Sequence, residues 1–294
     1  MTTTKQTPDF TKRAIQIGGS EIAAIMGLSP YETPLSLWAK KTGKLPPSDL
    51  SGFEAAEIGT ELEEYVARKF TKKTGIKLRV DNRTFAHPKY PYMIGHIDRW
   101  VVGEDALFEA KTCSAWLEKH WDGEEIPQHY VLQVMWYLGL VKKKIGHIAV
   151  LIGGQKFRTK QVEFDQELFD SMVEAARVFM EDYVLKDVPP MAQAGDSETL
   201  LHMFPESAPT ALRLEGQAAE EMDQLVEERL GGLESIRHAK EELEKLEARI
   251  KQICGENEAA ETDNVRVTWK TQHRKEYVVK ASSFRVLNAK KREG

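Results

Sequence analysis

Apolar residues recur with a helical period in several segments of this chain. In residues 53–74, Ile58, Leu62, Val66 and Phe70 recur every four residues, which predicts a helix with one apolar face. A glycine or proline after the last apolar position predicts the end of a helix. On the same grounds, further helices are predicted at residues 20–27 (with Ser20 as the N-cap), 34–42, 114–120, 128–140 and 165–185.

Shorter apolar runs between these helices predict strands. Residues 146–152 and 157–164 flank the pair Gly153-Gly154, which is typical of a hairpin. Further strands are predicted at residues 77–86 and 106–108. Strands that alternate with helices over residues 13–190 predict an α/β domain with a mixed central sheet flanked by helices. Residues 1–12 are polar and are predicted to lie outside it.

The composition of the chain changes after Pro190. Residues 191–214 are typical of a linker, and residues 215–255 predict a charged helical arm. The apolar residues of this arm step by 3, 4, 3, 4 and 3 positions, which is typical of a coiled-coil seam. They are Ile236, Ala239, Leu243, Leu246, Ile250 and Ile253, with Gly231-Gly232 interrupting the pattern upstream. Self-association, docking on the α/β domain and recruitment of a partner protein are all open roles for the arm.

Residues 256–294 are predicted to form a basic tail with a β-hairpin-like pattern. Strand-like runs lie at residues 265–269 and 277–279. Residues 270–294 contain eight Lys and Arg but only two Asp and Glu. Contact with DNA and a solvated hairpin are both open interpretations of this tail.

Bulk composition narrows the class of protein. The chain has 294 residues, of which 41% are apolar and 30% charged, which is ordinary for a globular protein. A formal net charge of −5 means that any binding of nucleic acid depends on a local patch. The two cysteines, Cys113 and Cys254, form no C-x-x-C motif and argue against disulfide, zinc or iron–sulfur frameworks. Without a signal peptide or a long apolar run, a cytoplasmic protein with no membrane segment is predicted.

One stretch carries candidate chemistry. Asp98 follows an apolar run, and Glu109 and Lys111 lie two positions apart, on the same face of a predicted strand. Carboxylate oxygens are the ligands that Mg²⁺ prefers, and a cation beside such a site relieves charge in phosphodiester hydrolysis. We therefore predict that Asp98 and Glu109, with the carbonyl of Ala110, bind Mg²⁺. Because these residue types are common, a solvated hairpin is the alternative at this point.

The neighbourhood adds three polar candidates. Glu63 lies on the polar side of the 53–74 helix, from which its carboxylate can approach the same cation. Gln133 and Tyr137 are four residues apart and share one helical face. Taken singly, Gln133 is typical of a surface amide and Tyr137 of a core aromatic.

The order of these motifs resembles the YqaJ-type viral recombinase family, whose members are relatives of phage lambda exonuclease. The resemblance covers residues from about 13 to 190. Its matching stretches are Ile17-Gly18-Gly19-Ser20-Glu21 through Tyr31, Gly59-Thr60-Glu61-Leu62-Glu63, Gly95-His96-Ile97-Asp98, Glu109-Ala110-Lys111-Thr112, Ile126-Pro127-Gln128-His129-Tyr130 through Gln133 to Tyr137, and Val150 to Gln155. One position departs from the pattern, because Arg99 stands where the family commonly has glycine.

The resemblance implies the restriction-endonuclease-like PD-(D/E)XK fold and a set of roles. It implies that Asp98, Glu109 and Glu63 ligate the metal, that Lys111 is the catalytic lysine and that Gln133 orients it. Mg²⁺ is the implied cofactor, with Mn²⁺ as a substitute.

Three further residues are candidates for binding DNA. Arg13 lies eight residues before Glu21, the interval of the family's 5′-phosphate-binding arginine, although a plain surface arginine is an equal alternative. Ser20 is predicted at a helix N-terminus, where an anion is favoured. Tyr137 completes the Q-x-x-x-Y motif.

The activity implied is a 5′→3′ exonuclease that acts on double-stranded DNA ends and leaves 3′ single strands for a single-strand annealing recombinase. A ring-shaped homotrimer is implied by relatives alone. Two alternatives remain open: a structure-specific or nicking endonuclease on the same fold, and a non-catalytic DNA-end-binding protein.

Overall fold

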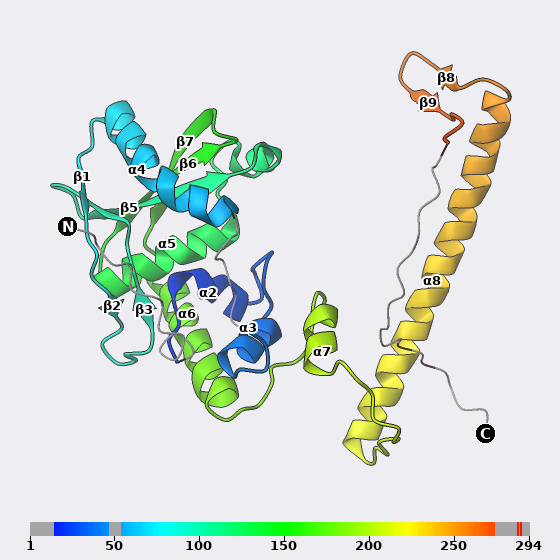
Figure 1. Ribbon diagram of the computed structural model, residues 1–294, viewed down its shortest axis with the longest axis horizontal. Coiled ribbons are helices and arrows are strands. Elements are labelled where there is room, and N and C mark those ends of the chain that lie inside the picture. The colour runs from blue at the N-terminus through cyan, green and yellow to red at the C-terminus, as the bar shows by residue number, and fades with distance from the viewer. Residues whose placement is uncertain (1–14, 47–53, 274–286, 288, 290–294) are drawn as a thin grey trace. The chain divides into compact units, whose positions relative to one another are not determined.

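The chain forms two compact units in a computed structural model, which describes residues 15–46, 54–273, 287 and 289 (Figure 1). The first unit spans Met1–Phe204 and the second Pro205–Gly294. Within the described ranges, no helix is long and apolar enough to cross a membrane.

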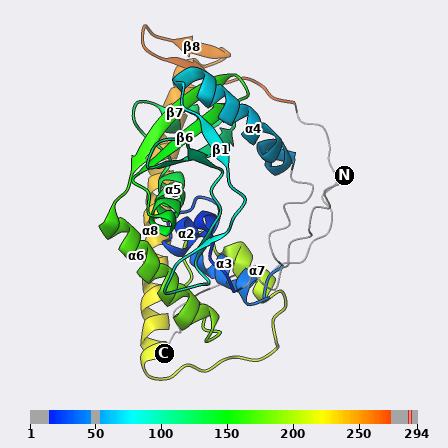
Figure 2. The ribbon, with the colours of Figure 1, turned by 90° about the vertical axis from the view of Figure 1, so that its left-hand side faces the viewer.

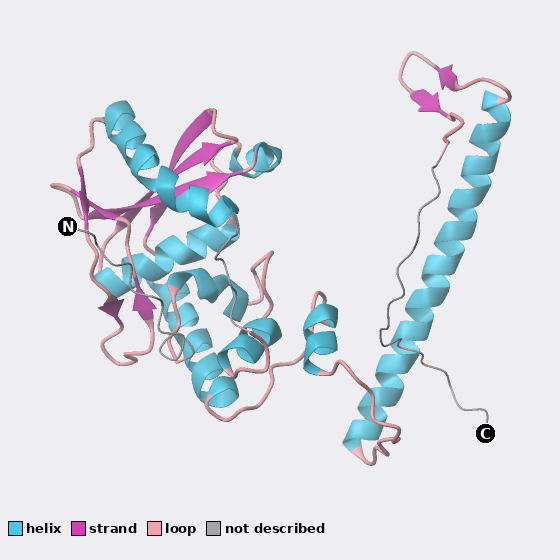
Figure 3. Cartoon of the chain, in the orientation of Figure 1, coloured by secondary structure: helices cyan, strands magenta, loops and turns pink. Residues whose placement is uncertain are grey.

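A five-stranded mixed sheet forms the centre of the first unit (Figure 3). Its order is β1-β4-β5-β6-β7, in which β5 and β6 are parallel and the other neighbours antiparallel. This confirms the predicted α/β class with a mixed central sheet. The strands are β1 (Leu78–Val80), β4 (Arg99–Val101), β5 (Ala106–Cys113), β6 (Ile145–Ile152) and β7 (Lys156–Glu163), and a separate pair joins β2 (Phe85–Ala86) to β3 (Ile94–Gly95).

Helices cover both faces of this sheet (Figures 1 and 2). Helix α4 (Glu54–Thr74) packs on one face through an apolar cluster that includes Phe70, Phe108 and Leu151. Helix α5 (Gln128–Val141) packs on the other face in a larger cluster that includes Leu107 and Val150. Alternate residues of each strand therefore serve opposite helices, as the period of two in a strand requires.

Two of the remaining helices contact α5 directly, namely α2 (Gly19–Ile25) and α6 (Gln166–Val178), and α3 (Pro34–Lys41) contacts α2. All three contribute to the same large cluster. Close approach of backbone to side chain lets α2 and α5 pack tightly, because a Cβ on Gly19 would lie 2.5 Å from Cε1 of Tyr137.

Several predicted elements differ in detail. The strand predicted at 77–86 is two short strands, β1 and β2, which join different sheets. The segment predicted as a helix at 114–120 is a 3₁₀-helix, Ala115–Trp121. The helix predicted at 165–185 ends its α-helical part at Val178 and continues as a π-helix over Phe179–Val184. The N-cap of α2 is Gly18 rather than Ser20, because the backbone N–H of Gly18 donates to Glu21 at 3.0 Å.

The predicted linker at 191–214 contains helix α7 (Ser197–Met203). Asp196 precedes this helix and is buried, where its carboxylate accepts hydrogen bonds from the hydroxyl of Thr33 and the backbone N–H of Gln193. A buried carboxylate with two donors fixes the start of α7 against α3. This contact joins residues 163 positions apart, so the local composition of residues 191–214 does not reveal it.

The described residues of the second unit include a 38-residue helix, α8 (Gln217–Cys254), and a small hairpin. Gly231 and Gly232 lie inside α8 and do not interrupt it. In the hairpin, β9 (Arg266–Thr268) pairs with β8 (Ala259–Glu261). The predicted strand at 277–279 lies outside the described residues.

Candidate functional site

Strand β5 and helix α5 meet at a polar cluster. Residues of β5 in phase with Leu107 face α5, so the period of two brings Glu109 and Lys111 to that side. Gln133 reaches them from α5, one turn before Tyr137. Only the packing of α5 on the sheet unites residues that are 22 or more positions apart.

A chain of hydrogen bonds fixes the lysine. The ammonium of Lys111 donates to Oε1 of Glu109 at 2.6 Å and to Oε1 of Gln133 at 3.0 Å. The amide nitrogen of Gln133 donates to Oε1 of Glu109 at 3.1 Å and to the hydroxyl of Tyr137 at 2.9 Å. Each of these side chains restricts the others, so Lys111 is held in one position. Its Nζ also lies 5.1 Å from the centre of the Tyr130 ring, close enough for a cation–π contact.

Asp98 joins the cluster from the segment before β4. Its Oδ2 accepts a hydrogen bond of 2.8 Å from the backbone N–H of Ala110. Glu109 is 3% exposed, and its second carboxylate oxygen, Oε2, is buried without a hydrogen-bond partner. An unpartnered buried carboxylate oxygen is costly unless a cation is bound there, so the donor set suits a hard divalent metal ion.

Burial and neighbouring charges perturb the acidic residues. Burial, followed by the charge on Glu109, raises the pKa of Asp98 to about 8. Burial likewise raises the pKa of Glu109, against the opposing charge of Lys111. Burial on its own lowers the pKa of Lys111, but the charges on Glu109 and Asp98 outweigh it and the pKa is raised. The lysine is therefore positively charged and the two carboxyl groups compete for negative charge.

Glu63 is held on the other side of β4. Arg99 is 6% exposed and shares the phase of Val101, which packs in the α4 cluster. Its guanidinium donates to Oε1 of Glu63 at 2.6 Å and to Oε2 of Glu64 at 2.9 Å. The charge of Glu63 still contributes to raising the pKa values of Asp98 and Glu109, so the three carboxylates share one electrostatic environment.

The predicted three-carboxylate metal site is therefore different in detail. Among the described residues, no group of three or more His, Cys, Asp and Glu side chains is placed to hold a metal ion. Asp98 and Glu109 are together, whereas Glu63 has an arginine partner. The sequence showed that Arg99 departs from the family pattern, but it did not show the ion pairs of Arg99, because Glu63 and Glu64 lie 36 and 35 residues earlier in the chain.

The remaining predicted residues have varied positions. Ser20 is exposed in the first turn of α2. Tyr137 is 7% exposed, and its hydroxyl accepts from Gln133. Arg13 lies outside the described residues.

Aromatic residues that sequence reasoning did not assign to the site extend outward from Lys111. The Tyr130 ring stacks on buried Trp121 and contacts His129, with ring centres 5.6 and 4.0 Å apart. His129 contacts the exposed ring of Tyr31 edge to face. The spacing of Tyr130 three residues before Gln133, on one side of α5, was the available signal.

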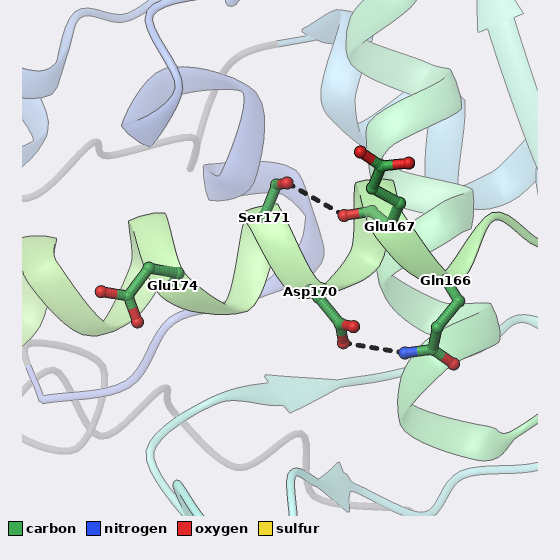
Figure 4. A pocket seen from close by; sticks show the side chains of 5 residues that line it. All are labelled: Gln166, Glu167, Asp170, Ser171 and Glu174. Atoms are coloured by element: carbon green, nitrogen blue, oxygen red, sulfur yellow. Dashed lines mark hydrogen bonds between the residues drawn. The ribbon is translucent and has the colours of Figure 1, made fainter.

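A separate open hollow lies along the outer surface of α6 (Figure 4). All five of its lining residues come from that helix, namely Gln166, Glu167, Asp170, Ser171 and Glu174. Three carboxylates repel a phosphate backbone, and the hollow shares no residue with the cluster around Lys111.

A known protein family matches the part of the chain that contains these residues. The family described as the YqaJ-like viral recombinase domain matches residues 10–143, a range that includes Asp98, Lys111 and Gln133. A Bacillus subtilis (strain 168) protein, the uncharacterized protein YqaJ, is 37% identical over 261 residues, which cover 86% of this chain and 80% of that protein. This chain belongs to the YqaJ-like viral recombinase family. The match to the Bacillus protein is too long to be confined to the first unit of this YqaJ-like chain, so it includes residues of the second.

Solved structures share the fold of part of this YqaJ-like chain. One is LHK-Exo in complex with dAMP, with a TM-score of 0.50 and 18% identity over 61% of this chain and 92% of that one. Another is described as an alkaline exonuclease, LHK-Exo, from Laribacter hongkongensis, with a TM-score of 0.50, 15% identity and the same coverage. At these identities the likeness shows the fold alone.

Proposed function

We propose that this YqaJ-like protein is a metal-dependent deoxyribonuclease that degrades one strand of linear duplex DNA from its 5′ end. The observation that carries the proposal is the position of Lys111, held by Glu109 and Gln133 next to Asp98. Membership of a viral recombinase family supports a role in DNA recombination, and the fold shared with an alkaline exonuclease supports hydrolysis at DNA ends.

The residues present fit a divalent metal ion. Asp98 and Glu109 would hold it, with the carbonyl of Ala110, and the unpartnered Oε2 of Glu109 is available for it. When bound, Mg²⁺ or Mn²⁺ polarises the phosphate and supplies an activated water. Two carboxylates that repel each other gain from a shared cation, which restores the ionised form of both.

The protein's own groups then act on the phosphate. The charged ammonium of Lys111 is placed to stabilise negative charge that develops in the transition state. Gln133 positions Lys111 through its amide oxygen, and Tyr137 positions Gln133 in turn. Because Tyr137 is buried, we assign it this supporting role in place of the DNA contact expected from sequence.

Arg13 as a 5′-phosphate anchor, Ser20 as a DNA contact, a homotrimeric ring and a single-strand annealing partner belong to the same proposal. The role of Arg13, the ring and the annealing partner rest on the family resemblance, and the role of Ser20 rests on its position in the first turn of α2. The endonuclease alternative predicts cleavage of covalently closed plasmid, whereas the end-dependent exonuclease leaves it intact. The end-binding alternative predicts affinity for ends without cleavage.

The test is digestion of linear duplex with and without a 5′-phosphate, in Mg²⁺, by wild type, Lys111→Ala and Lys143→Ala. Lys143 pairs with Asp105 at 2.8 Å outside the cluster, so its variant controls for the loss of a paired lysine. We expect Lys111→Ala to lose at least about 100-fold in rate and Lys143→Ala to retain wild-type rate. Undiminished cleavage by Lys111→Ala would refute the mechanism.

A further inference from the structure

Helix α8 carries an apolar stripe that the first unit's chemistry does not explain. The heptad seam places Ile236, Leu243 and Ile250 at a positions, and Ala239, Leu246 and Ile253 at d positions. The five large side chains of this seam are 42–78% exposed. A seam of six apolar layers at heptad spacing is the pattern that pairs with a second helix of the same kind.

We propose that this seam pairs with the seam of a second copy of the chain, in antiparallel orientation. In such a pair each a residue faces a d residue of the other copy. Aligning the seams end to end sets Ile236 opposite Ile253, Ala239 opposite Ile250 and Leu243 opposite Leu246. Twofold symmetry repeats these three layers, so all six apolar positions are used.

Core volume favours this orientation over the parallel one. In a parallel pair each residue faces its own copy, so Ala239 faces Ala239 and leaves a poorly filled layer. In the antiparallel pair both alanines face the larger Ile250. Large side chains opposite small ones keep the spacing of the two helices even along the seam.

The charged residues beside the seam also favour the antiparallel orientation. Glu242 and Arg249 occupy g positions, and Lys240 and Glu247 occupy e positions. The antiparallel alignment brings g residues of the two copies together as Glu242 with Arg249, and e residues together as Lys240 with Glu247. Symmetry doubles each, which makes four attractive contacts.

The parallel alignment instead pairs g residues with e residues five positions later. Glu242 then faces Glu247 twice, and no opposite charges meet. Charges at e and g positions set the orientation of coiled coils, because like charges across the seam are destabilising. Both the core and its flanks therefore select one partner, a second copy running the opposite way.

This pairing also has a geometric consequence. The symmetry axis passes between residues 244 and 245, so the two Gln217 residues are separated by roughly 55 residues of helical rise, about 80 Å at 1.5 Å per residue. The two chains therefore enter the pair far apart. The inference is independent of the proposed nuclease activity, because no residue of the seam belongs to the cluster around Lys111.

The test measures association of the full-length protein by sedimentation equilibrium over a range of concentrations. Glu242→Arg places arginine opposite Arg249 in the antiparallel pair, but opposite Glu247 in a parallel one. We expect it to weaken association by about tenfold or more, and the double variant Glu242→Arg/Arg249→Glu to restore it. The matched control is Glu244→Arg, which makes the same charge change at a b position, away from the seam.

Two measurements keep the outcome clear. Far-UV circular dichroism shows whether each variant keeps its helix, since Glu242 also pairs with Lys245 at 2.6 Å within α8. Leu243→Gln, which alters two of the six layers, is expected to weaken association as well. If the first unit forms an assembly of its own, the association through the seam is measured as the additional mass beyond that assembly. The seam variants should lose this additional mass. The inference would be overturned if Glu242→Arg associates as tightly as wild type or more tightly, or if the double variant does not restore association. It would also be overturned if wild type and Leu243→Gln show the same mass.

Discussion

Arg99 donates a hydrogen bond of 2.6 Å to Glu63, and this contact joins strand β4 to helix α4 beside the carboxylates of the site. The guanidinium of Arg99 is permanently positive, so it would compete with a metal ion for the carboxylate of Glu63. The second carboxylate on the same guanidinium, Glu64, adds a bond of 2.9 Å. Of the three carboxylates predicted to bind a metal ion, Glu63 is therefore the one that Arg99 holds, whereas Asp98 and Glu109 bond to the backbone of Ala110 and to Lys111 and Gln133.

We predict that Arg99→Ala increases divalent metal binding. Isothermal titration of the metal-free protein with Mn²⁺ or Mg²⁺ should show higher affinity or an additional site, because Glu63 and Glu64 lose their cation. Without metal, the variant should lose about 1–2 kcal/mol in free energy of unfolding; the partners are partly exposed, so the loss is smaller than for a fully buried pair.

The matched control is Arg83→Ala, which removes an arginine–carboxylate pair with Asp81 away from the cluster. It should leave metal binding unchanged. Equal metal binding by Arg99→Ala and wild type would contradict the competition.

The pKa of Asp98, raised to about 8, predicts a pH dependence of the metal-free protein. A carboxyl group whose folded pKa exceeds its unfolded value binds a proton more tightly when folded, so its contribution to stability is complete below about pH 4. That contribution falls as pH rises from about 4 to 8, by at most about 1.4 kcal/mol per pH unit. Asp98→Asn should flatten this part of the stability curve relative to wild type.

Metal binding should show the opposite trend with pH, because the ion binds the ionised carboxylate. Mg²⁺ affinity is expected to rise by up to about tenfold per pH unit as pH approaches 8, and to level off above it. Chemical denaturation and metal titration at pH 5, 6, 7 and 8 measure both effects. A pH-independent affinity over this range would contradict the assignment.

The contact between Gly19 and Tyr137 predicts an effect of a remote substitution on activity. A methyl group on Gly19 would lie 2.5 Å from the tyrosine ring, so the ring must shift, and its hydrogen bond to Gln133 shifts with it. We expect Gly19→Ala to cost about 1–3 kcal/mol in stability and to lower cleavage rate about tenfold without changing affinity for metal.

Gly18→Ala is the matched control for that experiment. A Cβ on Gly18 meets no heavy atom within 4 Å, and its φ of −97° suits alanine. Its activity should stay within about twofold of wild type, with a stability loss below about 1 kcal/mol at the N-cap. Equal activities of the two alanine variants would show that a shift of the Tyr137 ring does not affect catalysis by Lys111.

Periodicity in the sequence was sufficient to predict the main helices and to place Glu109 and Lys111 on the same face of a strand. Helix α4 matches its predicted segment because an apolar stripe at helical spacing needs no distant information. The two β5 residues share a face because the period of a strand is two. The α8 seam is determined in the same way, since heptad spacing is a local property.

Only the tertiary structure decided which side chains meet. Arg99 pairs with Glu63 because α4 crosses the sheet face that Arg99 shares with Val101, and no local pattern specifies that packing. Residues 77–86 divide between two sheets because β4 and β3 offer separate edges. Burial makes Tyr137 a support for Gln133, since the approach of α2 closes over its ring. Each of these outcomes depends on contacts between segments far apart in the chain, whose free energy is set by packing and not by local sequence.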